Sequence, residues 1–163
     1  MAGKPSAILW AIGGAALLTD QVSKYVMLSI LQNTPNGVIP VLPFLDAALV
    51  WNKGVSYGFF QAGSTMAALA LIAMSLVITG IMAYFLWHES ARWARFAYTL
   101  IISGALGNVI DRALHGAVID FISPHAFGYH WYVFNVADIW ISCGAALLIF
   151  SAFFSAKNTS SER

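Results

Sequence analysis

Apolar residues form four long stretches along this chain, and shorter, more polar stretches separate them. A helix needs about 20 mostly apolar residues to cross a bilayer, and each of the four stretches comes close to that length. We therefore predict four membrane-spanning helices, at about 7–31, 65–87, 93–110 and 137–154.

The two longer connections, at about 32–64 and 111–136, carry different patterns. The first has short apolar runs interrupted by prolines and by the sequence Asn52-Lys53-Gly54, which is typical of short strands around an Asn and Gly turn. The second is rich in Phe, Tyr and Trp, which are enriched at membrane interfaces. We expect a small β-element in the first connection and an interfacial aromatic loop or helix in the second.

Composition supports a membrane protein, because 60% of the residues are hydrophobic and only 9% are charged. A net charge of +1, with the basic residues scattered along the chain, argues against a nucleic-acid partner. The predicted fold class is an all-α membrane protein. It would form a single domain over residues 1–163, with four transmembrane helices, a small extracytoplasmic β-element and an interfacial aromatic loop or helix.

The basic residues also predict the orientation of the spans, because short cytoplasmic loops collect Lys and Arg. Such residues occur at the N-terminus, in the tight connection between the second and third spans, and at the C-terminus: Lys4, Arg92, Arg95, Lys157 and Arg163. Both termini are therefore predicted to be cytoplasmic and the two longer connections to face outward. The unusual polar residues of the chain fall on that outward half.

Two aspartates beside apolar spans are the first candidates for chemistry. An ionised carboxylate is expensive at such a place and is by default a functional hypothesis. Asp120 and Asp138 together suggest an acid/base dyad, in which one carboxyl holds a proton and the other does not. The alternative is a surface carboxylate at Asp120 and an N-terminal cap of the fourth span at Asp138. The spacing does not decide between them.

The first span contains a second pair of charges. Asp20 and Lys24 are four positions apart, so they share one helix face on which opposite charges stabilise each other. The pair is either part of a functional site or a self-neutralising pair near the interface.

Further polar residues cluster around the third and fourth spans. Asn108, Asp111 and Arg112 share a helix face, and the simplest interpretation of Asp111 with Arg112 is an ion pair or a salt-bridge network that holds the helix end. The amide of Asn108 must find partners in neighbouring helices or in a substrate. Asn135, three positions before Asp138, is either a helix cap or a group that hydrogen-bonds a substrate.

Together these motifs resemble the bacterial lipoprotein signal peptidases, or signal peptidase II family. The resemblance covers nearly the whole chain, with five groups of residues in the right order. They are Asp20, Gln21, Ser23 and Lys24; Asn52, Gly54 and Gly58; Gly107, Asn108, Asp111 and Arg112; Gly116, Val118, Asp120 and Phe121; and Phe134, Asn135, Ala137 and Asp138.

The resemblance implies a four-helix aspartic protease that removes the signal peptide from prolipoproteins, cutting just before a diacylglyceryl-modified cysteine. It matches the family's two catalytic aspartates to Asp120 and Asp138. Residues that bind substrate or support the site are matched to Asp20, Lys24, Asn52, Gly54, Asn108, Arg112 and Asn135.

No cofactor is expected, and no metal is expected because the spacings of His115, His125 and His130 match no common ligand motif. The expected partners are lipidated prolipoproteins, membrane lipids and inhibitors like the cyclic peptide globomycin. The expected location is the bacterial cytoplasmic (inner) membrane, with the active site toward its extracytoplasmic face.

Two other classes of function compete with this interpretation. A small ion or proton-coupled transporter also uses intramembrane Asp and Lys, but it predicts charges near the midplane and internal repeats. This chain has its charges near one face and shows no repeat. In a non-enzymatic scaffold, the carboxylates would act only as helix caps and ion pairs.

Overall fold

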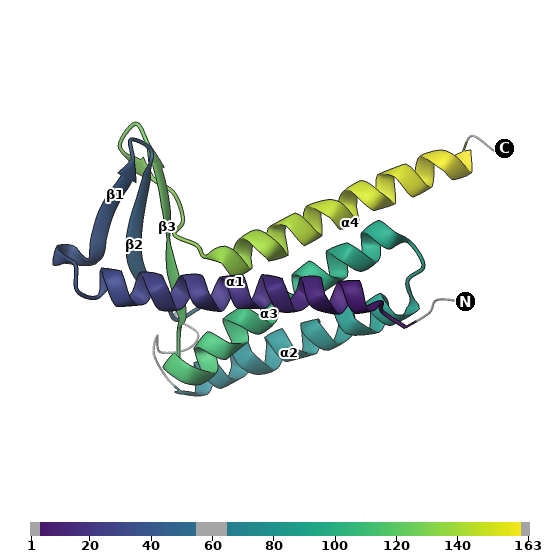
Figure 1. Cartoon of the computed structure of the whole chain (residues 1–163), viewed down its shortest axis with the longest axis horizontal. Helices are drawn as coiled ribbons and strands as arrows, with labels where there is room; N and C mark the ends of the chain where they lie inside the picture. The colour runs from purple at the N-terminus through teal and green to yellow at the C-terminus, as the bar shows by residue number, and fades with distance from the viewer. Residues whose placement is uncertain (1–3, 55–64, 161–163) are drawn as a thin grey trace.

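The computed structural model describes residues 4–54 and 65–160 and contains four long helices. They are α1 (Ala7–Leu31), α2 (Thr65–His88), α3 (Arg92–His115) and α4 (Val136–Ser160). These helices coincide closely with the four predicted ranges. Figure 1 shows them as a bundle, with both termini at the end opposite a small sheet. Helix α3 packs against each of the other three.

The helix ends follow local chemistry. At the start of α1, Ser6 is the N-cap, and its hydroxyl accepts a hydrogen bond from the backbone N–H of Leu9. Helix α3 ends at Gly116, whose φ of 73° lies in the left-handed region that glycine adopts without strain. This cap allows α3 to continue five residues beyond the predicted end of its span at 110.

Four antiparallel strands form the sheet at one end of the bundle, in the order β1-β2-β3-β4. They are β1 (Val38–Leu42), β2 (Leu45–Asn52), β3 (Val118–Ala126) and β4 (Tyr129–His130). A small hydrophobic core joins α1 to this sheet and consists of Leu31, Ala47, Ile119 and Phe121. The register of β2 and β3 places Asp120 opposite Val50, and Asn52 opposite Val118.

The first connection contains strands, as expected. The predicted turn at Asn52 and Gly54 falls at the end of β2, and it stays a prediction because the chain directly after Gly54 lies outside the described residues. The turn between β1 and β2 consists of Pro43 and Phe44, and Asn52 is the last residue of β2. Pro43 favours this turn, because its ring fixes φ and its nitrogen has no N–H to donate to a neighbouring strand. The remainder of the predicted apolar run, 55–60, lies outside the described residues.

The second connection differs more. An interfacial loop or helix was expected, but Val118–Ala126 forms β3 and Tyr129–His130 forms β4. The reason is that the first residues of β3 are buried and pair with β2, so that their backbone groups are satisfied within the sheet.

The four helices do not all meet a simple length and hydropathy criterion for membrane spans. Within the described residues, only Met66–His88 of α2 is both long and apolar enough to be recognised as a span, and α4 contributes a shorter apolar stretch, Val136–Ala152. Helices α1 and α3 carry the charged side chains described next. All four helices have 24 or 25 residues, which is sufficient to cross a bilayer.

Candidate active site

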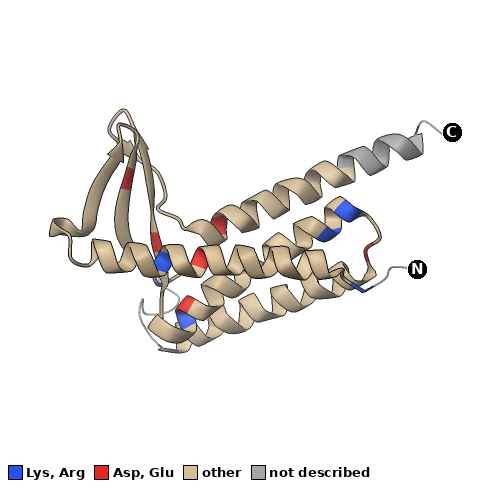
Figure 2. Ribbon diagram, in the orientation of Figure 1, with Lys and Arg blue, Asp and Glu red and all other residues tan. Residues whose placement is uncertain are grey.

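A cluster of polar side chains lies buried where the sheet meets α1, α3 and α4. Figure 2 shows charged residues at this end of the bundle and at the opposite end, with uncharged helix between them. Six polar residues of the cluster are at most 9% exposed: Asp20, Lys24, Asn108, Asp111, Asp120 and Asn135. Asp138 is half-buried at its edge. Buried charges of this kind persist only when they are paired and hydrogen-bonded.

Lys24 is the centre of one half of the cluster. Its Nζ lies 2.9 Å from Asp20 Oδ2, 3.0 Å from Asp111 Oδ2 and 2.9 Å from Asn108 Oδ1. These three acceptors satisfy the three N–H groups of the ammonium. The predicted Asp20–Lys24 pair is present, but it shares its cation with Asp111.

Asp111 belongs to a salt-bridge network at the end of α3, as one form of the prediction had it, but among the described residues it forms no ion pair with Arg112. Among the described residues the ion pair of Asp111 is with Lys24, whereas Arg112 donates from Nη1 to the carbonyl oxygen of Asn108 at 3.5 Å. Successive helical residues point about 100° apart, so Asp111 reaches α1 while Arg112 does not. The Nε of Arg112 is buried and has no hydrogen-bond partner within the described part of the chain.

The two carboxylates bound to Lys24 also hold the backbone. Asp20 Oδ1 accepts the N–H of Ala137 at 2.8 Å, in the first turn of α4. Asp111 Oδ2 accepts the N–H of Ile119 at 3.0 Å, near the start of β3. These carboxylates therefore connect α1 to α4 and α3 to the sheet.

Gln21 is a contributor that the sequence analysis did not treat as a site residue. Its Nε2 lies 3.1 Å from Asp20 Oδ2, 3.2 Å from Asp111 Oδ1 and 3.2 Å from the carbonyl oxygen of Gly107. A Cβ at Gly107 would overlap the carboxylate of Asp20, so glycine permits this close approach. The available signal was an uncharged polar side chain directly beside Asp20 in an apolar span.

At the start of α4, Asn135 and Asp138 cap the helix reciprocally. The N–H of Asp138 donates to Asn135 Oδ1 at 3.1 Å, and the N–H of Asn135 donates to Asp138 Oδ2 at 3.2 Å. This is a capping box, with Asn135 as the N-cap and Asp138 at the third helical position. Asp138 Oδ1 accepts Nδ2 of Asn108 at 3.0 Å. Capping thus positions the carboxylate of Asp138 at the cluster.

Asp120 is the most enclosed of the candidate catalytic groups. It lies in β3 with 1% exposure, so it is not a surface carboxylate of a loop. Its Oδ1 accepts Nδ2 of Asn135 at 2.6 Å and its Oδ2 accepts Nδ2 of Asn52 at 2.9 Å. The pKa of Asp120 is raised from 3.8 to about 6, chiefly by burial and also by the charge of Asp138. These two hydrogen bonds and the charge of Lys24 oppose the rise.

Asn52 is oriented toward Asp120 by the chain that follows it. The N–H of Gly54 donates to Asn52 Oδ1 at 2.9 Å, which leaves Nδ2 of Asn52 to donate to Asp120. Gly54 has a φ of 84°, and a Cβ at this position would overlap the side chain of Leu71. Both the backbone conformation and the lack of space therefore require glycine at position 54.

The cluster therefore brings together all nine residues predicted for the site. Its carboxylates and amides form one connected hydrogen-bond network across α1, α3, α4, β2 and β3. A carboxyl whose pKa lies near 6 can hold a proton close to neutral pH and release it again, which is the requirement for a general acid.

The fold belongs with those of bacterial membrane enzymes. Two solved structures, each titled as a bacterial membrane enzyme structure obtained by the in meso method, resemble this chain at 29% and 28% sequence identity, with TM-scores of 0.79 and 0.80. The first likeness covers 100% of this chain and 96% of the other, and the second covers 93% and 97%.

Sequence comparison defines the family. The model of the signal peptidase (SPase) II family matches residues 12–154. The lipoprotein signal peptidase of Thermodesulfovibrio yellowstonii is 43% identical over 135 residues, which are 82% of this chain and 86% of the relative. That of Nitrobacter hamburgensis is 40% identical over 143 residues, or 85% and 87%. The chain belongs to the signal peptidase II family, and the resemblance seen in its motifs is confirmed.

Proposed function

We propose that this protein is an aspartic endopeptidase of the bacterial cytoplasmic membrane. It removes the signal peptide from lipid-modified prolipoproteins and cuts just before the diacylglyceryl-bearing cysteine. Membership of the family supports the substrate class. The observation that carries the catalytic assignment is that Asn135 links Asp120 and Asp138 in one buried network, while among the described residues neither carboxylate forms an ion pair with Lys or Arg.

The two carboxyls have different surroundings, and these suggest their roles. Asp120 is buried and holds the proton, consistent with its raised pKa of about 6. Asp138 is half-buried in the first turn of α4, where the positive end of the helix dipole favours a negative charge. The two carboxyls share one proton, and the raised pKa of Asp120 favours that carboxyl as the position of the proton before substrate binds.

The reaction then proceeds by general acid and base catalysis. Ionised Asp138 accepts a proton from a water molecule, whose oxygen attacks the carbonyl carbon of the scissile peptide bond. Asp120 donates its proton to the carbonyl oxygen, giving a neutral tetrahedral intermediate. Asp138 then protonates the leaving nitrogen as the C–N bond breaks, and Asp120 recovers a proton from the intermediate's hydroxyl. No covalent enzyme intermediate is formed.

Substrate binding follows from the remaining side chains. Arg112 has a buried Nε with no partner among the described residues, and it is proposed to hold a peptide carbonyl of the substrate. Asn52 and Asn108 orient the carboxylates of Asp120 and Asp138. These two amides are themselves held in place by other residues of the cluster: Asp20, Lys24, Gly54 and Asn135. Cyclic peptides such as globomycin would inhibit by occupying the same position.

The membrane explains why the site is built inside a helix bundle. We propose that all four helices span the bilayer, with cytoplasmic termini and the sheet on the extracytoplasmic side. Moving a lipid-bearing peptide out of the bilayer costs much free energy, because each CH₂ buried in the bilayer contributes about 0.8 kcal/mol to membrane binding. The enzyme must therefore hold its carboxylates close to the depth of the substrate's lipid-bearing cysteine.

The test is separate replacement of each aspartate by asparagine. Asp120→Asn and Asp138→Asn are expected to lower the cleavage rate of a purified prolipoprotein by roughly 10²–10⁴-fold. Thermal unfolding in detergent checks that each variant is folded. The matched control is Asp46→Asn, which makes the same change in the same sheet at a carboxylate that pairs with His125 at 3.3 Å. Normal cleavage by either dyad variant would exclude the proposed mechanism.

A further inference from the structure

A groove runs between α1 and α2 at the end of the bundle opposite the sheet. Its volume is about 280 Å³. Helices α1 and α2 form its sides and α3 forms its floor, with Trp10 and Gly14, Ala83 and Trp87, and Ile102 and Leu106 among its walls. We call this feature the α1–α2 groove. It contains none of the residues assigned to the peptidase site.

Helix packing accounts for the groove. Helix α3 packs extensively against both α1 and α2, which themselves make little direct contact. Gly13 lies in the tight α1–α3 contact, where an added Cβ would be 3.1 Å from Ser103 Oγ. Gly14 is different, because a Cβ there would have no neighbour within 4 Å. A side chain introduced at Gly14 would therefore begin in open space.

The surface of the α1–α2 groove is apolar even where hydroxyls line it. Thr99 donates its hydroxyl to the carbonyl of Arg95 at 2.9 Å, and Ser103 donates to the carbonyl of Thr99 at 2.8 Å. Both donors are therefore satisfied within α3. An apolar pocket without unpaired donors suits hydrocarbon better than a polar ligand.

Two tryptophans bridge the groove near the helix ends. The rings of Trp10 and Trp87 meet edge to face with centroids 6.4 Å apart, and they are 59% and 45% exposed. Tryptophan favours the boundary between hydrocarbon and headgroups. This pair therefore indicates where the hydrocarbon part of the groove ends and the headgroup level begins.

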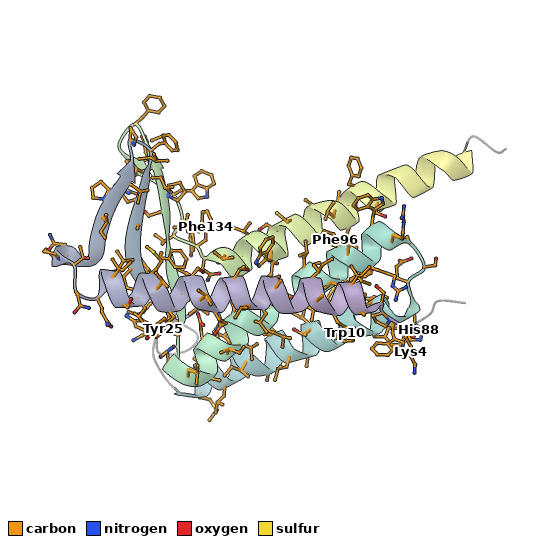
Figure 3. All side chains as sticks on the ribbon, in the orientation of Figure 1. Lys4, Trp10, Tyr25, His88, Phe96 and Phe134 are labelled. Carbon is orange, nitrogen blue, oxygen red and sulfur yellow. The ribbon has the colours of Figure 1, made fainter. Side chains whose placement is uncertain are left out.

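Basic side chains lie at that end of the bundle. Figure 3 shows Lys4, Trp10 and His88 there, and Figure 2 shows that the Arg residues at the start of α3 lie at the same end. The acidic side chain nearest in sequence, Glu89, accepts hydrogen bonds from the N–H groups of Ser90 and Ala91. Among the described residues, neither Lys4 nor Arg92 forms an ion pair.

From this arrangement we infer that the α1–α2 groove binds one anionic diacyl phospholipid of the cytoplasmic leaflet. An acyl chain occupies the groove, and the phosphate lies among Lys4, His88 and Arg92. Basic pockets between transmembrane helices on the cytoplasmic side are suited to anionic headgroups. The inference rests on the membrane orientation given under the proposed function, but not on the aspartate mechanism.

The size of the groove favours a lipid chain over a peptide. An α-helix with its side chains is about 10–12 Å wide, and a volume of about 280 Å³ is too small to admit one along the length of these walls. A flexible chain of methylene groups fits a narrow space of this kind. The positive charge at the open end then selects an anionic headgroup over a zwitterionic one.

The first test fills the groove without touching the charges. Gly14→Phe places a ring in the open space, and Ala15→Phe is the matched control. Ala15 is the next residue of α1, is exposed, and is not part of the groove wall. Delipidated protein is titrated with phosphatidylglycerol or with phosphatidylcholine of the same chains, and bound lipid is counted by native mass spectrometry.

The wild type and Ala15→Phe are expected to bind one phosphatidylglycerol in preference to phosphatidylcholine. Gly14→Phe should weaken this binding by about tenfold or more, because its ring displaces the acyl chain and several buried CH₂ groups lose their contacts. Unchanged binding by Gly14→Phe would overturn the inference, since the lipid would then be held by surface charge alone. Equal binding of both lipids by the wild type would overturn it as well.

The second test removes charge and leaves the groove open. Lys4→Gln and Arg92→Gln should each weaken phosphatidylglycerol binding by about fivefold and leave phosphatidylcholine binding unchanged. An unaltered preference in the double variant would contradict the assigned headgroup position. Asp120→Asn provides the separation from the proposed function: it should bind the lipid like the wild type while losing prolipoprotein cleavage.

Discussion

Four aspartates lie in one buried cluster, yet they form two pairs with different partners. Asp20 and Asp111 share the ammonium of Lys24, at 2.9 and 3.0 Å. Asp120 and Asp138 instead receive their hydrogen bonds from amide groups, with donor to acceptor distances of 2.6–3.2 Å. The two pairs are joined through Asn108, which accepts from Lys24 and donates to Asp138.

The difference separates structure from proposed chemistry. Asp20 and Asp111 are each bound to Lys24 and to a backbone N–H, so these groups are suited to holding α4 and β3 in place. Asp120 forms no ion pair among the described residues, and burial raises its pKa to about 6. The four aspartates of one cluster thus have two different environments, and the position of Lys24 decides which environment each has.

The largest effect is expected when that lysine is removed. Lys24→Met leaves two carboxylates buried without their cation, which should lower the free energy of unfolding by about 3–5 kcal/mol. Thermal or denaturant unfolding in detergent measures the loss. The triple variant Asp20→Asn/Lys24→Met/Asp111→Asn is neutral at these positions and should recover much of the stability. If Lys24→Met lowered the free energy of unfolding by less than about 1 kcal/mol, Lys24 would not distinguish the two aspartate pairs energetically.

The second effect is a pH dependence caused by Asp120. Its pKa is 3.8 as a free side chain and about 6 in the folded protein, so the folded state binds more protons between these pH values. Stability therefore falls as pH rises from about 4 to about 6, and the loss is complete above this window. At about 1.36 kcal/mol for each pH unit, the fall is at most about 3 kcal/mol.

Asp120→Asn should show a correspondingly flatter dependence of stability on pH. The comparison uses the change between pH 4 and pH 7 in each protein, so that any constant cost of the substitution cancels. Parallel curves for the two proteins would mean that Asp120 does not carry the raised pKa.

Asp111→Asn tests the other pair with a smaller expected effect. The variant keeps an oxygen for the N–H of Ile119 but weakens the pairing with Lys24, so unfolding should become easier by about 1–3 kcal/mol. Folded protein at low temperature should still cleave the prolipoprotein within about tenfold of the wild-type rate, a far smaller loss than for Asp120→Asn. Equally deep losses in both variants would show that the two pairs are not distinct.

The smallest effect concerns the tuning of Asp120 by Asn52. The mechanism needs protonated Asp120, so kcat/KM should fall as pH rises above about 6 in the wild type. Asn52→Ala removes a hydrogen bond that lowers the pKa of Asp120, and the falling limb should move to higher pH. Asn33→Ala is the control, because Asn33 donates to the carbonyl of Ser29, outside the cluster. A limb that stays in place or moves to lower pH would contradict this role of Asn52.

Much of the fold follows from local sequence patterns. The bounds of α1, Ala7 and Leu31, coincide with the predicted apolar stretch, because Ser6 caps its first turn and no proline interrupts it. The aromatic connection was harder to predict. The strand character of Val118–Ala126 depends on pairing with β2, and β2 lies far away in the sequence.

The site divides in the same way. Sequence alone determined which polar residues stand out in an apolar chain, that Asp20 and Lys24 share a helix face, and which family the motifs resemble. Tertiary structure alone decided that Asp111 pairs with Lys24 rather than with Arg112, and that Asn135 joins its own helix cap to Asp120. The physical reason is that the partners of a buried charge depend on distances of about 3 Å between segments that are remote in the chain. Such distances exist only after the helices and the sheet have packed.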